Sequence, residues 1–280
     1  MTAHLTWPDL TRRPRPDPDA TVTYGPDSMH RVDVWRPDGA GPFPTVLMVH
    51  GGCWTTAIAD RKLMNWVADD LRRHGIAVWN IDYRGVDRAG GGYPGTFADA
   101  ALAADRLATD AAAFGLDPRR LVAVGHSAGA HLALWLAARH RLPAGSALAT
   151  TDPLRIDHVV SLGGLPDLEA TAARPDNGCG TDVIGRLVGR PGPGRADVYA
   201  DTSIPRLLPL GVSQDVVGGV QDRIVPADMV RDYATRATAA GDAVRLTMIE
   251  NTGHVELVTP DSAAWSHTRA LIRAALGNAR

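Results

Sequence analysis

The chain has 280 residues, of which 45% are hydrophobic and 21% charged, and its 29 lysines and arginines against 31 acidic residues give a formal net charge of −2. This composition argues against disorder and against nucleic-acid binding, which would need a basic face. Met1–Ala20 carries prolines and charges in place of a signal peptide's apolar core, and no run of about 18 apolar residues follows. These features predict a protein with no nucleic-acid or membrane partner.

The N-terminal part of the chain is predicted to be an arm followed by a hairpin. Residues 1–20 are rich in proline and form the arm. Residues 21–280 are predicted to be a single domain, since one α/β domain can reach this length. Two extended runs, Val22–Tyr24 and His30–Trp35, flank the turn-forming Gly25-Pro26-Asp27 and predict the hairpin.

Downstream of the hairpin, strands alternate with helices. The uniformly apolar run Thr45–Val49 is typical of a strand buried on both faces of a parallel sheet. Further strands are predicted at 76–81, 121–124, 158–162, 216–217 and 244–249. Helices are predicted at 59–74, 97–114, 128–141, 227–240 and 262–275. The pattern indicates an α/β fold with a mostly parallel, doubly wound sheet of about eight strands, whose site lies beyond the carboxyl ends of the strands.

Residues 169–202 interrupt the alternation. The stretch is rich in proline and glycine and is too long for an ordinary connection between elements. We interpret it as an insertion over the site, which would be either a lid or a surface loop.

Ser127 lies in Gly125-His126-Ser127-Ala128-Gly129, which matches the G-x-S-x-G pattern of a nucleophilic serine on a sharp turn. The context fits the pattern, because a predicted strand precedes the pentapeptide and a predicted helix follows it. The alternative is a tight turn in which Ser127 only caps the helix.

A glycine pair follows the predicted strand at 45–49, in His50-Gly51-Gly52-Cys53-Trp54. Acyl transfer builds negative charge on a carbonyl oxygen, and backbone N–H groups aimed at that oxygen stabilise it. We predict that the N–H groups of Gly52, Cys53 and Ala128 form this oxyanion hole. An ordinary strand-to-helix turn is the alternative.

A serine nucleophile needs a histidine base, and His254 is the best placed of the ten histidines. It follows the last predicted strand, where a loop can bring it over the sheet edge. His126 and His131 lie close to Ser127 in the sequence, but the geometry of strand and helix is expected to point them away from it.

Asp222 is the predicted carboxylate partner of His254, because it follows the strand at 216–217 and precedes a helix. The resulting order of serine, aspartate and histidine is the order that α/β-hydrolases use. Asp167 is the reserve candidate, and Asp215 lies at the wrong end of its strand.

Together these motifs resemble the α/β-hydrolase superfamily, most closely its H-G-G-x-W branch of kynurenine-formamidase-like and small carboxylesterase enzymes. The resemblance runs from about Thr21 to the C-terminus and includes Asp82-Tyr83-Arg84 and Ile224-Val225-Pro226. It implies the α/β-hydrolase fold and a Ser127, His254 and Asp222 triad. It does not distinguish between substrates, because esterases, formamidases and some peptidases share these motifs.

The predicted function is a serine hydrolase that cleaves a small carboxylic ester or an N-formyl arylamide through an acyl-enzyme. The alternatives are an exopeptidase or amidase acting on short peptides, and an inactive hydrolase-fold binding protein. Trp54 and Tyr93 are the predicted substrate-binding residues, and a homodimer is possible.

The chain has only two cysteines, Cys53 and Cys179, too few for a disulfide framework or a zinc site. They suit a reducing cytosol and predict a cytoplasmic protein, with Cys53 as a small packed side chain. The sequence lacks G-K-[ST] and H-E-x-x-H, so no cofactor and no metal are predicted.

Overall fold

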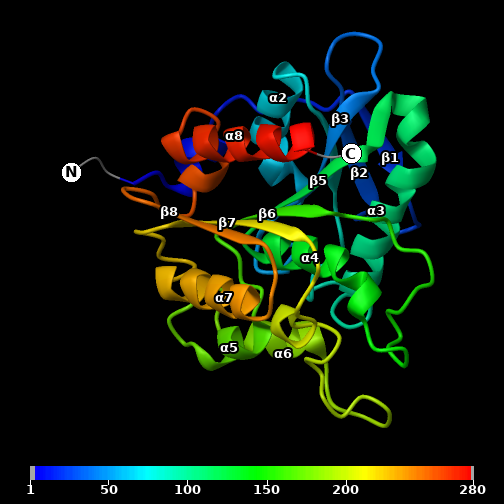
Figure 1. Ribbon diagram of the computed structural model, residues 1–280, viewed down its shortest axis with the longest axis vertical. Helices are drawn as coiled ribbons and strands as arrows, with labels where there is room; N and C mark the ends of the chain where they lie inside the picture. Colours follow the sequence, from blue (N-terminus) through cyan, green and yellow to red (C-terminus); the bar gives the residue numbers. More distant parts are fainter. Residues whose placement is uncertain (1–3, 279–280) are drawn as a thin grey trace.

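The predicted strands join into one sheet. The computed structural model describes residues 4–278, and its sheet has eight strands in the order β1-β2-β4-β3-β5-β6-β7-β8 (Figure 1). The strands are β1 (Ala20–Thr23), β2 (Arg31–Trp35), β3 (Phe43–Val49), β4 (Ala77–Ile81), β5 (Leu116–His126), β6 (His158–Leu162), β7 (Ser213–Gly219) and β8 (Val244–Ile249). β2 is antiparallel to both of its neighbours, and all other pairs are parallel. The predicted α/β fold class and the predicted hairpin are therefore confirmed.

Helices cover both faces of the sheet. They are α1 (Trp7–Thr11), α2 (Asn65–Arg73), α3 (Gly95–Phe114), α4 (Ala128–Ala137), α5 (Leu168–Ala173), α6 (Asp182–Val188), α7 (Ala227–Ala239) and α8 (Ala263–Asn278). α2 and α8 lie on one face, and α4 and α7 on the other (Figure 1). Among the described residues, no helix has both the length and the apolar character needed to span a bilayer.

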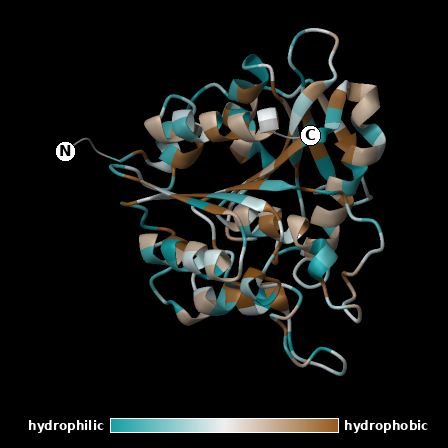
Figure 2. Ribbon diagram, viewed as in Figure 1, coloured by the Kyte–Doolittle hydropathy of each residue, from teal (hydrophilic) through white to brown (hydrophobic). Residues whose placement is uncertain are grey.

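The two faces have separate hydrophobic cores, and β3 contributes to both. Val46 and Met48 pack into the core under α2 and α8, while Leu47 and Val49 pack into the core on the opposite face. Successive side chains of a strand point to opposite faces, so a strand with helices on both sides is apolar at every position. Figure 2 shows the resulting hydrophobic colouring along the central strands.

Two segments are more ordered than their composition predicts. The N-terminal arm contains α1, where the Asp9 carboxylate accepts hydrogen bonds from the Thr6 backbone N–H at 2.7 Å and the Thr6 hydroxyl at 2.6 Å. These bonds lower the pKa of Asp9. The insertion at 169–202 holds most of α5 and all of α6, whose inner faces are buried.

Candidate active site

Ser127 stands on the sharp turn between β5 and α4. Its φ of 56° and ψ of −124° put it in a sparsely populated region of backbone space, which costs a non-glycine residue about 1–3 kcal/mol. The turn packs so closely that a Cβ at Gly129 would lie 2.2 Å from the Val49 carbonyl oxygen, so only glycine fits there. The helix-cap alternative would require a hydrogen bond between the Ser127 hydroxyl and a backbone N–H of α4. The Ser127 side chain makes no such bond.

The loop after β3 lies against this turn. A Cβ at Gly51 would come within 3.0 Å of the Ser127 Cβ, so glycine lets the two backbones meet. Gly52, Cys53 and Trp54 follow with positive φ angles of 106°, 50° and 51°. Among the described residues, the backbone N–H groups of Gly52, Cys53 and Ala128 donate to no partner. Three donors beside a serine are thus available to an incoming oxygen.

His50 holds the start of this loop. One ring nitrogen, Nδ1, binds the Gly51 carbonyl oxygen at 2.7 Å, and the other, Nε2, binds Asp82 Oδ1 at 2.9 Å. Arg61 donates to Asp82 Oδ2 at 3.0 Å. Burial opposes the charge of Arg61, but Asp33 and Asp82 outweigh it and raise the pKa of the guanidinium. The histidine of the H-G-G-x-W motif is therefore a fixed support for residues 50–54, which carry two of the predicted oxyanion donors and are called the oxyanion loop below.

His254 and Asp222 form a second imidazole–carboxylate pair. His254 Nδ1 donates to Asp222 Oδ2 at 2.6 Å, and both side chains are buried. Asp222 Oδ1 accepts the backbone N–H groups of Ile224 at 2.8 Å and Val225 at 2.9 Å. The carboxylate is thus fixed by the turn that follows β7. No described residue hydrogen-bonds to His254 Nε2.

Ser127 contacts the last residue of β6, and the His254–Asp222 pair lies beside the residue after it. The Ser127 N–H donates to the Leu162 carbonyl oxygen at 2.8 Å, and a Cβ on the next residue, Gly163, would lie 3.3 Å from His254 Cε1. The structure has no Ser127–His254 hydrogen bond. This contact is often long in ligand-free hydrolases and shortens when substrate binds.

His126 contacts His254 directly, so it lies beside the histidine of the predicted triad. The two ring centroids are 4.3 Å apart, and His126 Nε2 donates to the His254 carbonyl oxygen at 3.2 Å. Burial lowers the pKa of His126 well below its usual value, and the nearby His254 adds to this effect. A neutral His126 can fix the His254 backbone without repelling a charged His254 ring.

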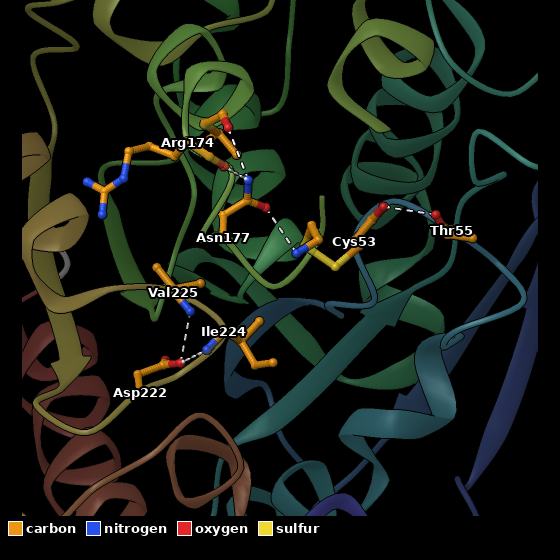
Figure 3. The surroundings of a disulfide bond; sticks show 9 residues. Cys53, Thr55, Arg174, Asn177, Asp222, Ile224 and Val225 are labelled. Atoms are coloured by element: carbon orange, nitrogen blue, oxygen red, sulfur yellow. Dashed lines mark hydrogen bonds between the residues drawn. A yellow bond between two sulfur atoms is a disulfide. The ribbon is translucent and has the colours of Figure 1, made fainter. Parts of the chain in front are cut away.

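Cys53 is not a free packed thiol, because it forms a disulfide with Cys179 (Figure 3). The two residues are 126 positions apart in the sequence, and the insertion brings Cys179 to the oxyanion loop with its Cα 5.4 Å from that of Cys53. Disulfides are rare in a reducing cytosol, so the two cysteines no longer support a cytoplasmic location. The Cys53 backbone N–H is unaffected by the bond.

The segment around Cys179 joins the oxyanion loop to the loop of the acid. Asn177 Oδ1 accepts the Cys179 N–H at 3.0 Å, and the Gly178 N–H donates to the Ile224 carbonyl oxygen at 2.8 Å. Figure 3 shows Ile224 beside Asp222, below this segment. The insertion thus connects two loops that carry predicted site residues.

The two predicted substrate-binding residues lie in different surroundings. Trp54 is fully buried, and its indole N–H donates to His131 Nδ1 at 3.2 Å, which leaves it no exposed surface for substrate. Tyr93 is half-buried and packs on the insertion, where its hydroxyl donates to Asp201 at 2.9 Å and its ring lies 3.4 Å from the Arg195 guanidinium carbon.

The other acid candidates have structural partners. Asp167 caps α5 by accepting the Ala170 N–H at 3.0 Å and also pairs with Arg236. Asp215 binds His158 Nε2 at 2.8 Å. Within residues 4–278, no group of three or more His, Cys, Asp or Glu side chains is placed to hold a metal ion.

A cavity of about 580 Å³ borders His254, between the loops after β7 and β8 and the N-terminal arm. A larger cavity of about 920 Å³ lies at the opposite ends of the strands and includes the first residues of β6, β7 and β8. Ligands of parallel sheets bind at the carboxyl ends, so the smaller cavity is the one that belongs to this site.

Comparison with known proteins identifies the family. The family model BD-FAE matches residues 32–232, which is more than two-thirds of the chain. The chain belongs to the BD-FAE family. The match includes β2 to β7, the oxyanion loop, Ser127 and Asp222, and it stops short of His254.

Curated relatives of this BD-FAE member match over a shorter region. A probable isoprenylcysteine alpha-carbonyl methylesterase of Arabidopsis thaliana is 32% identical over 114 residues, which cover 40% of this chain and 23% of the plant protein. The match therefore spans less than a quarter of the plant protein's length.

Solved structures match the BD-FAE chain over nearly its whole length. A truncated carbohydrate esterase from gut microbiota has a TM-score of 0.73 at 18% identity, covering 93% of this chain and 97% of its own. Thermogutta terrifontis esterase 2, phosphonylated by sarin, has a TM-score of 0.73 at 20% identity and 95% coverage of both chains. At these identities the likeness establishes the fold. Together with the match to the BD-FAE family model and the methylesterase relatives, it confirms the predicted membership of the α/β-hydrolase superfamily.

Proposed function

We propose that the protein is a carboxylic-ester hydrolase with Ser127 as nucleophile, His254 as general base and acid, and Asp222 as the residue that orients His254. The observation that carries the proposal is the buried His254–Asp222 pair, 2.6 Å between Nδ1 and Oδ2, beside a serine held on a strained turn. The names of its relatives, which include esterases and methylesterases, support this chemistry.

The reaction begins when Ser127 Oγ attacks the substrate carbonyl carbon and its proton passes to His254 Nε2. The carbonyl oxygen becomes an oxyanion that accepts hydrogen bonds from the backbone N–H groups of Gly52, Cys53 and Ala128. His254 then gives its proton to the leaving alcohol as the carbon–oxygen bond breaks. Water attacks the acyl-enzyme with the same base, which releases the carboxylic acid and restores Ser127.

Asp222 acts by fixing which nitrogen of His254 is free. It binds the Nδ1–H, so Nε2 carries the lone pair that accepts the serine proton. Two backbone N–H groups hold the other oxygen of Asp222, so the carboxylate cannot rotate away without losing both bonds.

The other predicted substrates would use the same machinery. N-formyl arylamides undergo the same acyl transfer and belong in the same assay panel. An exopeptidase or amidase would also use the same triad, so aminoacyl anilides complete the panel.

Labelling with a fluorophosphonate tests the proposal. Intact mass should show one adduct per chain on the wild type and none on Ser127→Ala or His254→Ala. Ser266 and His267 are exposed residues of α8 and provide matched controls. Ser266→Ala and His267→Ala should label like the wild type. Hydrolysis of p-nitrophenyl esters should fall about 10⁴-fold or more in Ser127→Ala. An adduct or full turnover in Ser127→Ala would refute the proposal.

A further inference from the structure

The N-terminal segment His4–Pro8 forms one wall of the cavity beside His254. The opposite wall comes from the loops after β7 and β8, so the segment lies across the carboxyl edge of the sheet. The indole of Trp7 meets two site histidines edge to face, with ring centroids 6.2 Å from His254 and 6.0 Å from His126. A segment that precedes the first strand of the sheet thus contacts the proposed general base.

Glu256 fastens this segment to the catalytic loop. One oxygen of its buried carboxylate accepts the Leu5 N–H at 2.7 Å, and the other accepts the Gly253 N–H at 3.1 Å, one residue before His254. Further along the arm, Trp66 donates to the Pro14 carbonyl oxygen at 3.0 Å, and Asn65 to that of Pro16 at 2.9 Å. Anchors at residue 5 and at residues 14 and 16 make the described part of the arm a fixed wall.

The position of the cavity indicates which part of a substrate it receives. His254 gives its proton to the leaving group, so the cavity that borders its ring is the place for the leaving alcohol. This assignment rests on the proposed function. The substrates that test the assignment should therefore be esters that differ only in their alcohol.

The lining indicates the chemistry of that alcohol. Apolar side chains dominate both walls, namely Leu5, Trp7, Pro8, Ile224 and Val255. Arg223 lies at the rim, is exposed, and has no ion-pair partner within the described chain. Flat aromatic groups pack well against an indole, and a guanidinium favours a negative substituent over a positive one.

We infer that His4–Pro8 completes the leaving-group pocket, that Trp7 sets its preference for an aromatic alcohol, and that Arg223 favours an anionic substituent on that alcohol. Trp7 and Arg223 are specificity-determining residues, since neither acts on the reacting atoms.

Four acetate esters test the inference with the acyl group held constant: ethyl, phenyl, 4-carboxyphenyl and 4-(trimethylammonio)phenyl acetate. Dividing the kcat/KM of each variant by that of the wild type, ester by ester, removes differences in intrinsic reactivity. In Trp7→Ala, phenyl acetate should lose about tenfold more than ethyl acetate, and Trp7→Phe should recover most of the difference. Equal losses for both esters would mean that Trp7 only supports His254, and would overturn the assignment.

Arg223→Gln tests the charge preference. The ratio of kcat/KM for the carboxyphenyl ester to that for the trimethylammonio ester should fall about fivefold, the size of an exposed charge interaction. Arg12→Gln, which removes an exposed arginine of the arm outside the cavity, should leave the ratio at the wild-type value. An unchanged ratio in Arg223→Gln would overturn this part.

Failure of the proposed function would look different. In that case the wild type would hydrolyse none of the four esters, or Ser127→Ala would hydrolyse them as fast as the wild type. If only the leaving-group assignment failed, hydrolysis would still require Ser127. Trp7→Ala and Arg223→Gln would then change kcat/KM by the same factor for all four esters.

Discussion

Two buried imidazole–carboxylate pairs lie at the carboxyl edge of the sheet, and they are built alike. His50 follows β3 and binds Asp82, which follows the neighbouring strand β4. His254 follows β8 and binds Asp222, which follows the neighbouring strand β7. In both pairs, adjacent parallel strands deliver a histidine and an aspartate to the same edge.

The pairs differ in what is left free. Both ring nitrogens of His50 are bound, one to Asp82 and one to the Gly51 carbonyl oxygen, and Arg61 takes the second oxygen of Asp82. His254 uses one nitrogen for Asp222 and has no protein partner on the other within the described residues. A histidine–aspartate pair therefore becomes a catalytic candidate by keeping one nitrogen open, and becomes a scaffold when both are used.

Asp222→Asn should produce the largest effect. An asparagine amide donates to His254 Nδ1, which moves the ring proton to Nε2 and removes the base. We expect kcat to fall about 10⁴-fold with an unfolding midpoint close to that of the wild type. Steady-state kinetics and urea denaturation measure the two quantities, and a fall of less than tenfold would contradict the assigned role of Asp222.

The oxyanion loop is held at His50 and, three residues later, by the disulfide at Cys53. Opening a cross-link between positions 126 residues apart should lower the free energy of unfolding by about 5 kcal/mol. We expect Cys53→Ser/Cys179→Ser to show this loss with kcat reduced less than tenfold, because the His50 pair still supports the loop. A dithiol reductant should lower the free energy of unfolding of the wild type but not that of the double variant. A large loss of kcat at unchanged stability would show that His50 alone cannot hold the loop.

Asp82→Asn should act on stability first. The change leaves Arg61 and His50 buried without a carboxylate they share, which should cost about 3 kcal/mol of unfolding free energy. The kcat of the folded protein should remain within tenfold of the wild type, in contrast to Asp222→Asn. If the two variants gave the same kinetic defect, the distinction between scaffold and catalytic pair would be wrong.

His131 is a third buried histidine, but it has no carboxylate partner among the described residues. Its substitution should have the smallest effect, a change in how stability depends on pH. It accepts from Trp54 and donates to the Thr202 carbonyl oxygen, and burial lowers its pKa to about 4. The unfolded chain takes up a proton near pH 6.5 while the folded protein does not, so stability falls as pH falls below 6.5. Between pH 6.5 and pH 5 the wild type should lose about 2 kcal/mol more than His131→Gln. Parallel pH profiles in urea denaturation would disprove this.

The sequence predicts the residues that follow regular strands. Ser127, Asp222 and His254 each lie within five residues of the end of a strand, and parallel topology carries such positions to one edge. The sequence does not distinguish the roles of His50 and His254, because that difference lies in which atoms surround each ring.

Contacts between irregular segments could not be predicted. The pairing of Cys53 with Cys179 depends on how the insertion folds back, and the contact of Trp7 with His254 depends on the path of a proline-rich arm. One local signal was available: Thr6 followed three residues later by Asp9 resembles the start of a helix, and α1 begins there.

The disulfide also makes part of the chain a covalent ring. Ser127 lies inside the ring between Cys53 and Cys179, while Asp222 and His254 lie outside it. The ring includes an exposed loop around Gly145, the kind of segment that proteases cut first. A single cut there would leave the serine and its histidine in separate peptides that stay joined through sulfur. The nicked enzyme would run as one band on a gel until a reductant divides it.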